Sequence, residues 1–521
     1  MTPGVTDLLA AGPPAVVALT AVVVLLGSLL PRRPRPPVVP TLAGLTLAAV
    51  WVAAQAWTPL GRETRQAFCL GPAEAGVLCS YSAGDLTLVL QALVLAGAAV
   101  VVLMSAAAVP EQRLPAGEFY LLLLCSVCGA LTLAAGGDLI TLLVALELVS
   151  LPGFALVGLR NRDARAGEAA LTFFLVSVVS AAVTLFGISL VYGATGAVHL
   201  DAVRAGLAAS GTVAPMAALG VVLTVVGFAF KVAAVPFHFW APDTYAGAPL
   251  PVAAYLAVVS KAAGFVGLIL LLVVAFRPLA AVWGPLVAVL AALTMTVGNL
   301  VALRQRAAVR LLAWSSVAHA GYLLVPLSVA ASADGRRVLG EAVGATVVYL
   351  VVYAAMNLGA FAVATAVSRR RPANLLTDYR GLARRAPLQA AALAFFLAAL
   401  AGLPPGLSGL FAKIVVFRAA LDGDVAWLAL VMAVNTVVAL AYYLTWGAQL
   451  FRADPQDDVV GSSAAAPVTP RPLRLALGCT LVATVALSVL PQLALQVIPG
   501  ISAGLDEPPQ PVAARTVAPL R

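Results

Sequence analysis

Long apolar runs, separated by short polar segments, make up most of this 521-residue chain. A helix of about 20 apolar residues crosses the ~30 Å hydrocarbon core of a bilayer, so each run of that length predicts a transmembrane helix. The pattern predicts about fourteen such helices, and an even number places both ends of the chain on the same side of the membrane. The predicted spans are 14–30, 39–57, 85–109, 118–135, 139–159, 168–193, 214–238, 250–276, 279–302, 310–330, 342–367, 388–421, 425–450 and 473–499.

Prolines interrupt two of the predicted helices. Pro236 lies in the seventh span, and Pro404 and Pro405 lie in the segment LPPGLSG, which divides the twelfth span. Proline removes a backbone donor, and within a bilayer such breaks are tolerated where they line a cavity. If spans 4–8 and 9–13 are two five-helix units, each has a broken fourth helix. That pattern is typical of inverted repeats around a transport site.

The spans predict an all-α integral membrane protein without a separate soluble domain. The longest polar stretches, 58–84 and 368–387, are too short to bury a core of their own. We therefore divide the chain by its helices. The predicted regions are a three-helix segment at 1–110, a first five-helix repeat at 111–277, a second at 278–450, and a final region at 451–521 that holds a cytoplasmic loop, the last transmembrane helix and a short outside tail.

Composition and charge agree with a multi-pass protein embedded in a lipid bilayer. The chain is 62% hydrophobic and 10% charged, with a mean hydropathy of +1.02, whereas soluble domains carry roughly 25% charged residues. The loops on alternate sides hold 19 and 9 arginines, and the positive-inside rule makes the richer set cytoplasmic and both termini outside. The net charge of +9 follows mostly from this asymmetry. Nucleic-acid binding would need basic clusters interleaved with aromatics, which the sequence lacks.

Lysine is confined to the predicted spans. Of 31 basic residues 28 are arginine, and the three lysines, Lys231, Lys261 and Lys413, all lie within apolar runs. A guanidinium cannot release its proton in a protein, but a buried ammonium can. Glu147, nine residues after Asp138, is a carboxylate near mid-bilayer, which costs about 3 kcal/mol and calls for a partner or an aqueous cavity. We expect Lys231 to be that partner and all four groups to transfer protons.

Two structural interpretations compete with proton transfer. A lysine near a helix end can extend its ammonium to the headgroups, which is conceivable for Lys231 but not for Lys261, ten or more residues from both ends of its span. Alternatively, Glu147 and Lys231 form a pair that only fixes helix packing. We favour proton handling because intramembrane ionisable residues usually mark ion pathways.

Histidine and cysteine add weaker candidates. His238, in PFHFW, is a candidate proton relay or a cap for backbone carbonyls, and His319, in a polar stripe with Ser315, Ser316 and Tyr322, is a candidate relay or a hydrogen-bonded packing residue.

Cys69 and Cys79 share a predicted outside loop and are a candidate disulfide, given an oxidising compartment. Cys125 and Cys128 have CxxC spacing but lie within a span, where small packing residues are expected. No metal site is predicted.

Four segments of the chain resemble the antiporter-like subunits of respiratory complex I and, within that family, the N subunits of bacterial NADH-quinone oxidoreductase. The resemblance covers roughly residues 115–450. It is carried by DLITLLVALELVSLPGFALVGLR, GFAFKVAAVPFHFWAPDTYAGAPLPVAAYLAVVSKAAG, NLVALRQRAAVRLLAWSSVAHAGYLL and LPPGLSGLFAKIVVFRAAL.

The resemblance implies two inverted five-helix repeats and assigns roles by motif. Glu147 and Lys231 would be the coupling pair, Lys261 the central lysine and Lys413 the terminal lysine of a proton path. It also implies subunits M and K as neighbours and a bacterial cytoplasmic membrane as the location. The first hundred residues match weakly, and His319 falls where related subunits vary.

The expected function is that of a proton-translocating membrane-arm subunit of NADH:quinone oxidoreductase. The chain lacks a GxGxxG after a strand, a cysteine cluster and a flavin or haem signature, so NADH, FMN, iron–sulfur clusters and quinone would be used elsewhere in the complex. The alternatives are a subunit of a multi-subunit cation/proton antiporter or membrane-bound hydrogenase, and a structural membrane-arm scaffold.

Overall fold

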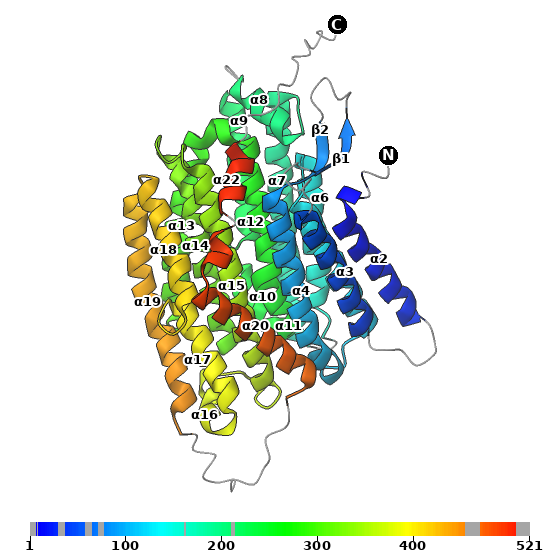
Figure 1. Cartoon of the computed structure of the whole chain (residues 1–521), viewed down its shortest axis with the longest axis vertical. Helices are drawn as coiled ribbons and strands as arrows, with labels where there is room; N and C mark the ends of the chain where they lie inside the picture. Colours follow the sequence, from blue (N-terminus) through cyan, green and yellow to red (C-terminus); the bar gives the residue numbers. More distant parts are fainter. Residues whose placement is uncertain are drawn as a thin grey trace.

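The structure is a computed structural model of the whole chain. It describes residues 7, 9–29, 37–57, 65–70, 78–160, 163–209, 214–453, 469–496 and 498–506. The helices form one bundle whose long members run roughly parallel (Figure 1). The start of α2 and the end of α22 lie near the same end of this bundle. The predicted all-α membrane fold is confirmed.

The N-terminal half contains a short hairpin and most of the long helices. Its elements are α2 (Gly12–Leu29), α3 (Val38–Trp57), β1 (Arg65–Leu70), β2 (Leu78–Ala83), α4 (Asp85–Glu111), α5 (Ala116–Leu133), α6 (Leu139–Val157), α7 (Ala164–Thr195), α8 (Leu200–Ala208), α9 (Ala214–Lys231), α10 (Trp240–Gly247), α11 (Leu250–Tyr255), the π-helical η4 (Leu256–Ser260), α12 (Lys261–Ile269), the π-helical η5 (Leu270–Ala275) and η6 (Arg277–Leu279).

In the described part of the C-terminal half, all the elements are helices. Its elements are α13 (Ala280–Ala302), α14 (Ala308–Leu324), η7 (Pro326–Ala331), α15 (Leu339–Ser368), η8 (Leu376–Tyr379), α16 (Leu382–Arg385), α17 (Pro387–Ala401), α18 (Leu407–Asp422), α19 (Ala426–Phe451), α20 (Arg471–Val489), α21 (Gln492–Leu495) and α22 (Ile498–Asp506).

Twelve described helical segments are long and apolar enough to cross a membrane. The other two predicted spans also contain helices, but these are shorter: α14 stops at Leu324, and the twelfth span is divided into α17 and α18. The proline interruptions therefore lie where helices end. After α9, Pro236 precedes the start of α10, and Pro404 and Pro405 separate α17 from α18.

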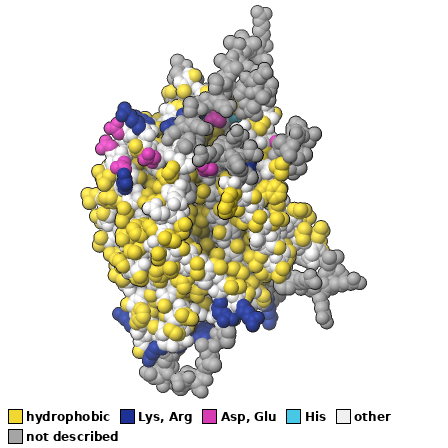
Figure 2. Space-filling model, in the orientation of Figure 1, with side chains coloured by type: hydrophobic (Ala, Val, Ile, Leu, Met, Phe, Trp, Pro, Cys, Tyr) yellow, Lys and Arg dark blue, Asp and Glu magenta, His cyan; other side chains and the backbone are white. Residues whose placement is uncertain are grey.

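The surface between the two ends of the bundle is mostly hydrophobic in Figure 2, and basic side chains gather at its lower end, whereas basic and acidic side chains are mixed at the upper left. This distribution suits a belt of lipid between two polar faces. Two segments are almost wholly enclosed by the others: α15, and the segment from α11 to η5 that carries Lys261. They form the interior against which the candidate residues pack.

The segment between α3 and α4 forms an antiparallel hairpin of β1 and β2, which the sequence did not predict. Cys69 and Cys79 face each other in the register of the two strands and are joined by a disulfide. A backbone bridge between Tyr81 and Gly136 holds the hairpin against the end of α5. Of the described cysteines, Cys125, Cys128 and Cys479 are free.

Candidate functional site

The three lysines are buried inside the bundle. Lys231 is 3% exposed, Lys261 1% and Lys413 5%. Lysine is almost never fully buried unless its ammonium has partners. Each of these ammonium groups does have oxygen partners, and the partners differ.

Lys231 is the last residue of α9, at the first break. Its Nζ donates a hydrogen bond of 2.8 Å to Ser150 Oγ on α6. Ser150 lies three residues after Glu147, so the hydroxyl and the carboxylate lie on the same face of α6. The helix break ends α9 at the level where α6 presents this polar pair.

Glu147 and Lys231 line one small pocket with the hydroxyls of Ser150, Ser180 and Thr184, and the pocket has room for about one water molecule. Among the described residues, no ion pair within 4.0 Å joins Glu147 and Lys231, and the direct partner of Lys231 is Ser150. The two groups that we expected to be partners thus line the same pocket, but the sequence analysis did not name Ser150, which Lys231 contacts directly.

Lys261 is the first residue of α12, directly after the π-helical turn η4. Its Nζ donates to Ser316 on α14, at 2.7 Å to the hydroxyl and 2.5 Å to the carbonyl. Tyr353 on α15 also donates to the Ser316 hydroxyl, at 2.9 Å, and Asn357 Nδ2 donates to Tyr353. Three helices therefore meet at the Ser316 hydroxyl.

The Lys231 and Lys261 sites touch at Gly264. A Cβ at this position would lie 3.0 Å from Lys231 Cγ, so the glycine lets the lysine stem pass close to α12. Because Gly264 follows Lys261 by three residues, the two ammonium groups belong to adjoining parts of one interior region.

His319, 2% exposed, lies between the Lys261 and Lys413 sites. Its ring packs against Tyr353, which belongs to the Lys261 site, and against Tyr322, over whose ring Lys413 lies. Its Nδ1 is 2.9 Å from the hydroxyl of Tyr349, and its Nε2 is 3.2 Å from the hydroxyl of Tyr443. Tyr443 also makes a short hydrogen bond with Ser315. The predicted polar stripe of α14 is thus completed by tyrosines from α15 and α19.

Lys413 lies in α18, beyond the second break. Its Nζ donates to the carbonyls of Leu400 and Ala401, at 3.2 and 2.8 Å, and lies 5.5 Å from the ring centre of Tyr322. Carbonyls at a helix C-terminus lack intrahelical partners and carry partial negative charge. By ending α17 at this depth, the break supplies acceptors for the ammonium.

His238 is separate from this path. Its ring packs edge-on against Trp314, with ring centres 5.2 Å apart. Its buried Nδ1 makes no hydrogen bond to any described residue, and no described contact joins it to a lysine.

A large cavity of about 1460 Å³ opens among the ends of α4, α7, α10, α14 and α15. We call it the vestibule. Ion pairs line it: Arg310 with Asp243 at 2.6 Å, and Arg369 with Glu111 at 2.6 Å.

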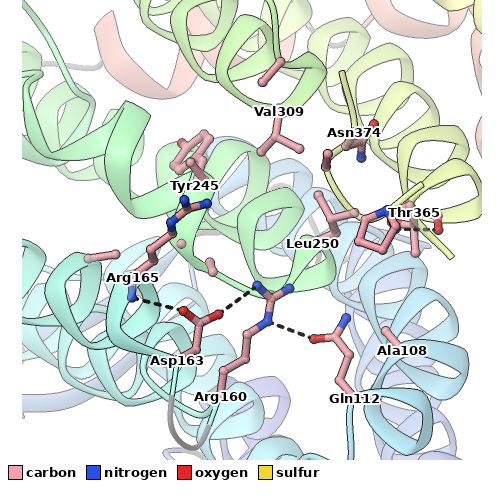
Figure 3. Close-up of a pocket in the computed structure, with 18 of the residues that line it drawn as sticks. Ala108, Gln112, Arg160, Asp163, Arg165, Tyr245, Leu250, Val309, Thr365 and Asn374 are labelled. Carbon is pink, nitrogen blue, oxygen red and sulfur yellow. Dashed lines mark hydrogen bonds and ion pairs between the residues drawn. The ribbon is translucent and has the colours of Figure 1, made fainter. Parts of the chain in front are cut away.

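Figure 3 shows Arg160 on another part of the vestibule wall, bonded to Asp163 and Gln112. Burial lowers the pKa of Arg160, and Asp163 opposes this shift. The sequence did not predict this cavity, because its walls come from five helices distant in sequence.

The family model of the transmembrane region of NADH:quinone oxidoreductase and Mrp antiporters matches residues 136–439. The chain belongs to this family. The matched region contains Glu147 and all three lysines, so the candidate path lies within the part that the family shares.

Among the relatives of this family member are N subunits. NADH-quinone oxidoreductase subunit N 2 of Streptomyces griseus is 52% identical, over 94% of this chain and 93% of the relative. Subunit N of Salinispora tropica is 48% identical, over 85% and 84%. The expected resemblance to the N subunits is therefore confirmed.

Solved structures agree in fold. A chain of respiratory complex I from Thermus thermophilus is 33% identical, with a TM-score of 0.72 over 93% of this chain and 98% of its own length. A chain of the Mrp complex from a Dietzia species has a TM-score of 0.80 over 97% and 98%, at 21% identity, which shows the fold alone. The described residues contain no group of three or more His, Cys, Asp or Glu side chains arranged to hold a metal ion.

Proposed function

We propose that this chain is a proton-translocating membrane-arm subunit of NADH:quinone oxidoreductase, and that Glu147, Lys231, Lys261 and Lys413 carry its proton-linked charge changes. Family membership and the N-subunit relatives support the complex. The observation that carries the residue assignment is the burial of all three lysines against oxygen acceptors, along one interior zone of hydroxyl, phenol and imidazole groups.

The mechanism follows from charges acting on their neighbours. Quinone reduction elsewhere in the complex changes the field at one end of the membrane arm, and Lys231 moves toward or away from Glu147 in response. Opposite charges favour and like charges disfavour ionisation of a neighbour. Each change therefore alters the proton affinity of the next group, from Lys231 to Lys261 and on to Lys413. His319 and its tyrosines lie between the last two lysines and relay the proton.

In this proposal the redox chemistry belongs to other subunits. NADH, FMN, the iron–sulfur clusters and the quinone would be bound outside this chain, which contributes the membrane passage. The vestibule, lined by arginines of the loops assigned to the cytoplasm, faces the cytoplasm of a bacterium, and both termini face outside.

Neighbouring subunits cover the wall beside Glu147. Glu147 is only partly buried, and around it α6 exposes apolar side chains such as Val144, 61% exposed, and Leu151, 54% exposed. A carboxylate facing lipid at this depth is costly, whereas a protein neighbour can shield it or pair with it. Subunits M and K of the membrane arm are the proposed neighbours of this chain.

Purification through an affinity tag on this chain tests the assignment to the complex. We expect NADH:quinone reductase activity, FMN and iron–sulfur clusters to co-purify with the chain. Recovery with hydrogenase activity, or with antiporter subunits and without NADH oxidation, would overturn the assignment.

A further inference from the structure

Buried polar atoms that lack described protein partners occur at the wall of the vestibule and in the helices behind it. Tyr245 lines the cavity and is 0% exposed, and its hydroxyl makes no hydrogen bond to any described residue. The same holds for Thr244 Oγ1 and, deeper in the bundle, Asn357 Oδ1. Buried polar atoms are nearly always paired, with water where protein offers no partner. These three atoms therefore indicate a hydrated passage leading inward from the vestibule.

The passage leads to Lys261. Tyr245 lies on α10, which packs against α14, the helix that carries Ser316. The Ser316 oxygen already accepts hydrogen bonds from Lys261 and Tyr353. When Lys261 is neutral, the Ser316 hydroxyl can donate its proton to Lys261 Nζ, and its oxygen can then accept from Tyr353 and from a neighbour on the vestibule side, where Tyr245 lies. Asn357 Nδ2 donates a 2.9 Å hydrogen bond to the Tyr353 hydroxyl, and Asn357 Oδ1 has no described hydrogen-bond partner.

We propose that Tyr245 is the proton-transfer residue between the vestibule and Lys261. The proposal rests on the proposed function and names the route by which this lysine meets the aqueous phase. When Lys261 is neutral, a proton arriving at the Tyr245 oxygen displaces the phenolic proton to the Ser316 oxygen, and the Ser316 proton moves to Lys261 Nζ. One N–H bond forms, and Tyr245 and Ser316 end with as many protons as before.

The helix that carries Tyr245 connects the vestibule with the Lys231 break. At one end of α10, Trp240 Nε1 donates to the carbonyl of Phe230, the residue before Lys231, at 3.1 Å. Asp243, in the first turn of the same helix, pairs with Arg310, and Asp243, Tyr245 and Ala246 line the vestibule. Because α10 has only eight residues, a shift at the end of α9 moves Tyr245 relative to Ser316. The charge state of Lys231 thereby controls proton access to Lys261.

The test uses the assembled complex in inverted membrane vesicles, with pumping measured as the rate of NADH-driven proton uptake into the vesicles. Tyr245→Phe removes the hydroxyl and keeps the ring. The matched control is Tyr379→Phe, which also removes a fully buried hydroxyl near the vestibule, one that donates to Asn374. We expect Tyr245→Phe to lower the rate of proton uptake roughly tenfold or more and Tyr379→Phe to pump normally.

Two further variants separate proton transfer from packing. Tyr245→His restores an exchangeable proton, and its pumping should recover with a pH dependence that the native protein lacks. Ala246→Trp places a large ring at an exposed position inside the vestibule, leaves Tyr245 intact, and should slow proton uptake. It tests the route even where Tyr245→Phe fails to assemble.

Lys261→Ala, measured in parallel, distinguishes the two proposals. If Lys261→Ala abolishes pumping while Tyr245→Phe and Ala246→Trp pump at the native rate, the vestibule route is wrong and the proposed function stands. If Lys261→Ala itself pumps normally, the proposed role of Lys261 fails, and the route to it fails with it.

Discussion

The acceptors of the three lysines have different chemistry. Ser150 offers Lys231 a hydroxyl, and Ser316 offers Lys261 a hydroxyl as well as its backbone carbonyl. A hydroxyl accepts from a charged ammonium and can donate to a neutral amine. Lys413 meets two carbonyls, which only accept. Lys231 and Lys261 are therefore suited to gaining and losing a proton in place, whereas Lys413 is held most firmly while it is charged. This difference makes Lys413 the natural end of the sequence of charge changes.

A substitution at Gly264 tests whether the close packing of the Lys231 and Lys261 sites matters for pumping. Gly264→Val would push side-chain atoms into the stem of Lys231 and move the ammonium away from Ser150, at a cost of about 1–3 kcal/mol in packing. We expect the complex to assemble and proton pumping to fall. Gly447→Val is the control, because a Cβ there meets no atom within 4 Å. Equal pumping by the two variants would show that the packing at Gly264 does not position Lys231.

Residue type and depth were enough to predict which lysines are buried, because the middle of a long apolar run lies in the hydrocarbon core, where an ammonium must turn toward the protein interior. The partners were harder to predict. Ser150 is three residues from Glu147, so helical spacing could have identified it as a partner of Lys231. No sequence spacing could join His319 to Tyr443, because they lie 124 residues apart on different helices.

At the scale of elements, each of the two helix breaks positions a buried lysine or its acceptors, by a different arrangement. The first places Lys231 at the end of α9 and starts α10, which reaches the vestibule. The second ends α17 and presents its last carbonyls to Lys413. Proline in an apolar run predicted both breaks. The hairpin of β1 and β2 was not predicted, since its strands are short and only partly apolar.

The disulfide of this hairpin gives a test of both pairing and orientation. A membrane-impermeant maleimide applied to intact cells should label the chain only after reduction, because Cys69 and Cys79 are bonded and are assigned to the outside. Cys79→Ala should expose Cys69 to labelling without reduction. Labelling of the unreduced native chain at Cys69 would contradict the disulfide, and labelling only in inverted vesicles would reverse the proposed orientation.

At the scale of the whole molecule, the protein is a bundle with a largely apolar outside surface and a mostly apolar core that encloses the polar groups around the three lysines. The fold class could be predicted from the length and number of apolar runs, because only helices satisfy the backbone along such runs in lipid. The vestibule could not, because it is created by the relative placement of five helix ends. Nor could the sequence show that Glu147 lies near the outer wall.

A crosslinking experiment tests whether a protein covers that wall. A photoreactive amino acid at Val144 should crosslink to a second membrane-arm subunit in the intact complex, because this face of α6 borders the pocket of Glu147. The same chain after detergent dissociation of the complex should give no crosslink. Absence of a crosslink in the intact complex would mean that lipid covers the wall, and Glu147 would then need its partner from within this chain.

The central claim is that a buried lysine carries protons, and NADH-driven acidification of inverted vesicles bearing Lys231→Ala or Lys231→Arg tests it most directly. Assembly of both variants is checked on a native gel. We predict that both assemble and both lose pumping, because arginine keeps the charge but cannot release the proton. Full pumping by Lys231→Arg would mean that Lys231 acts as a fixed charge. Full pumping by Lys231→Ala would mean that Glu147 and Lys231 have only a structural role.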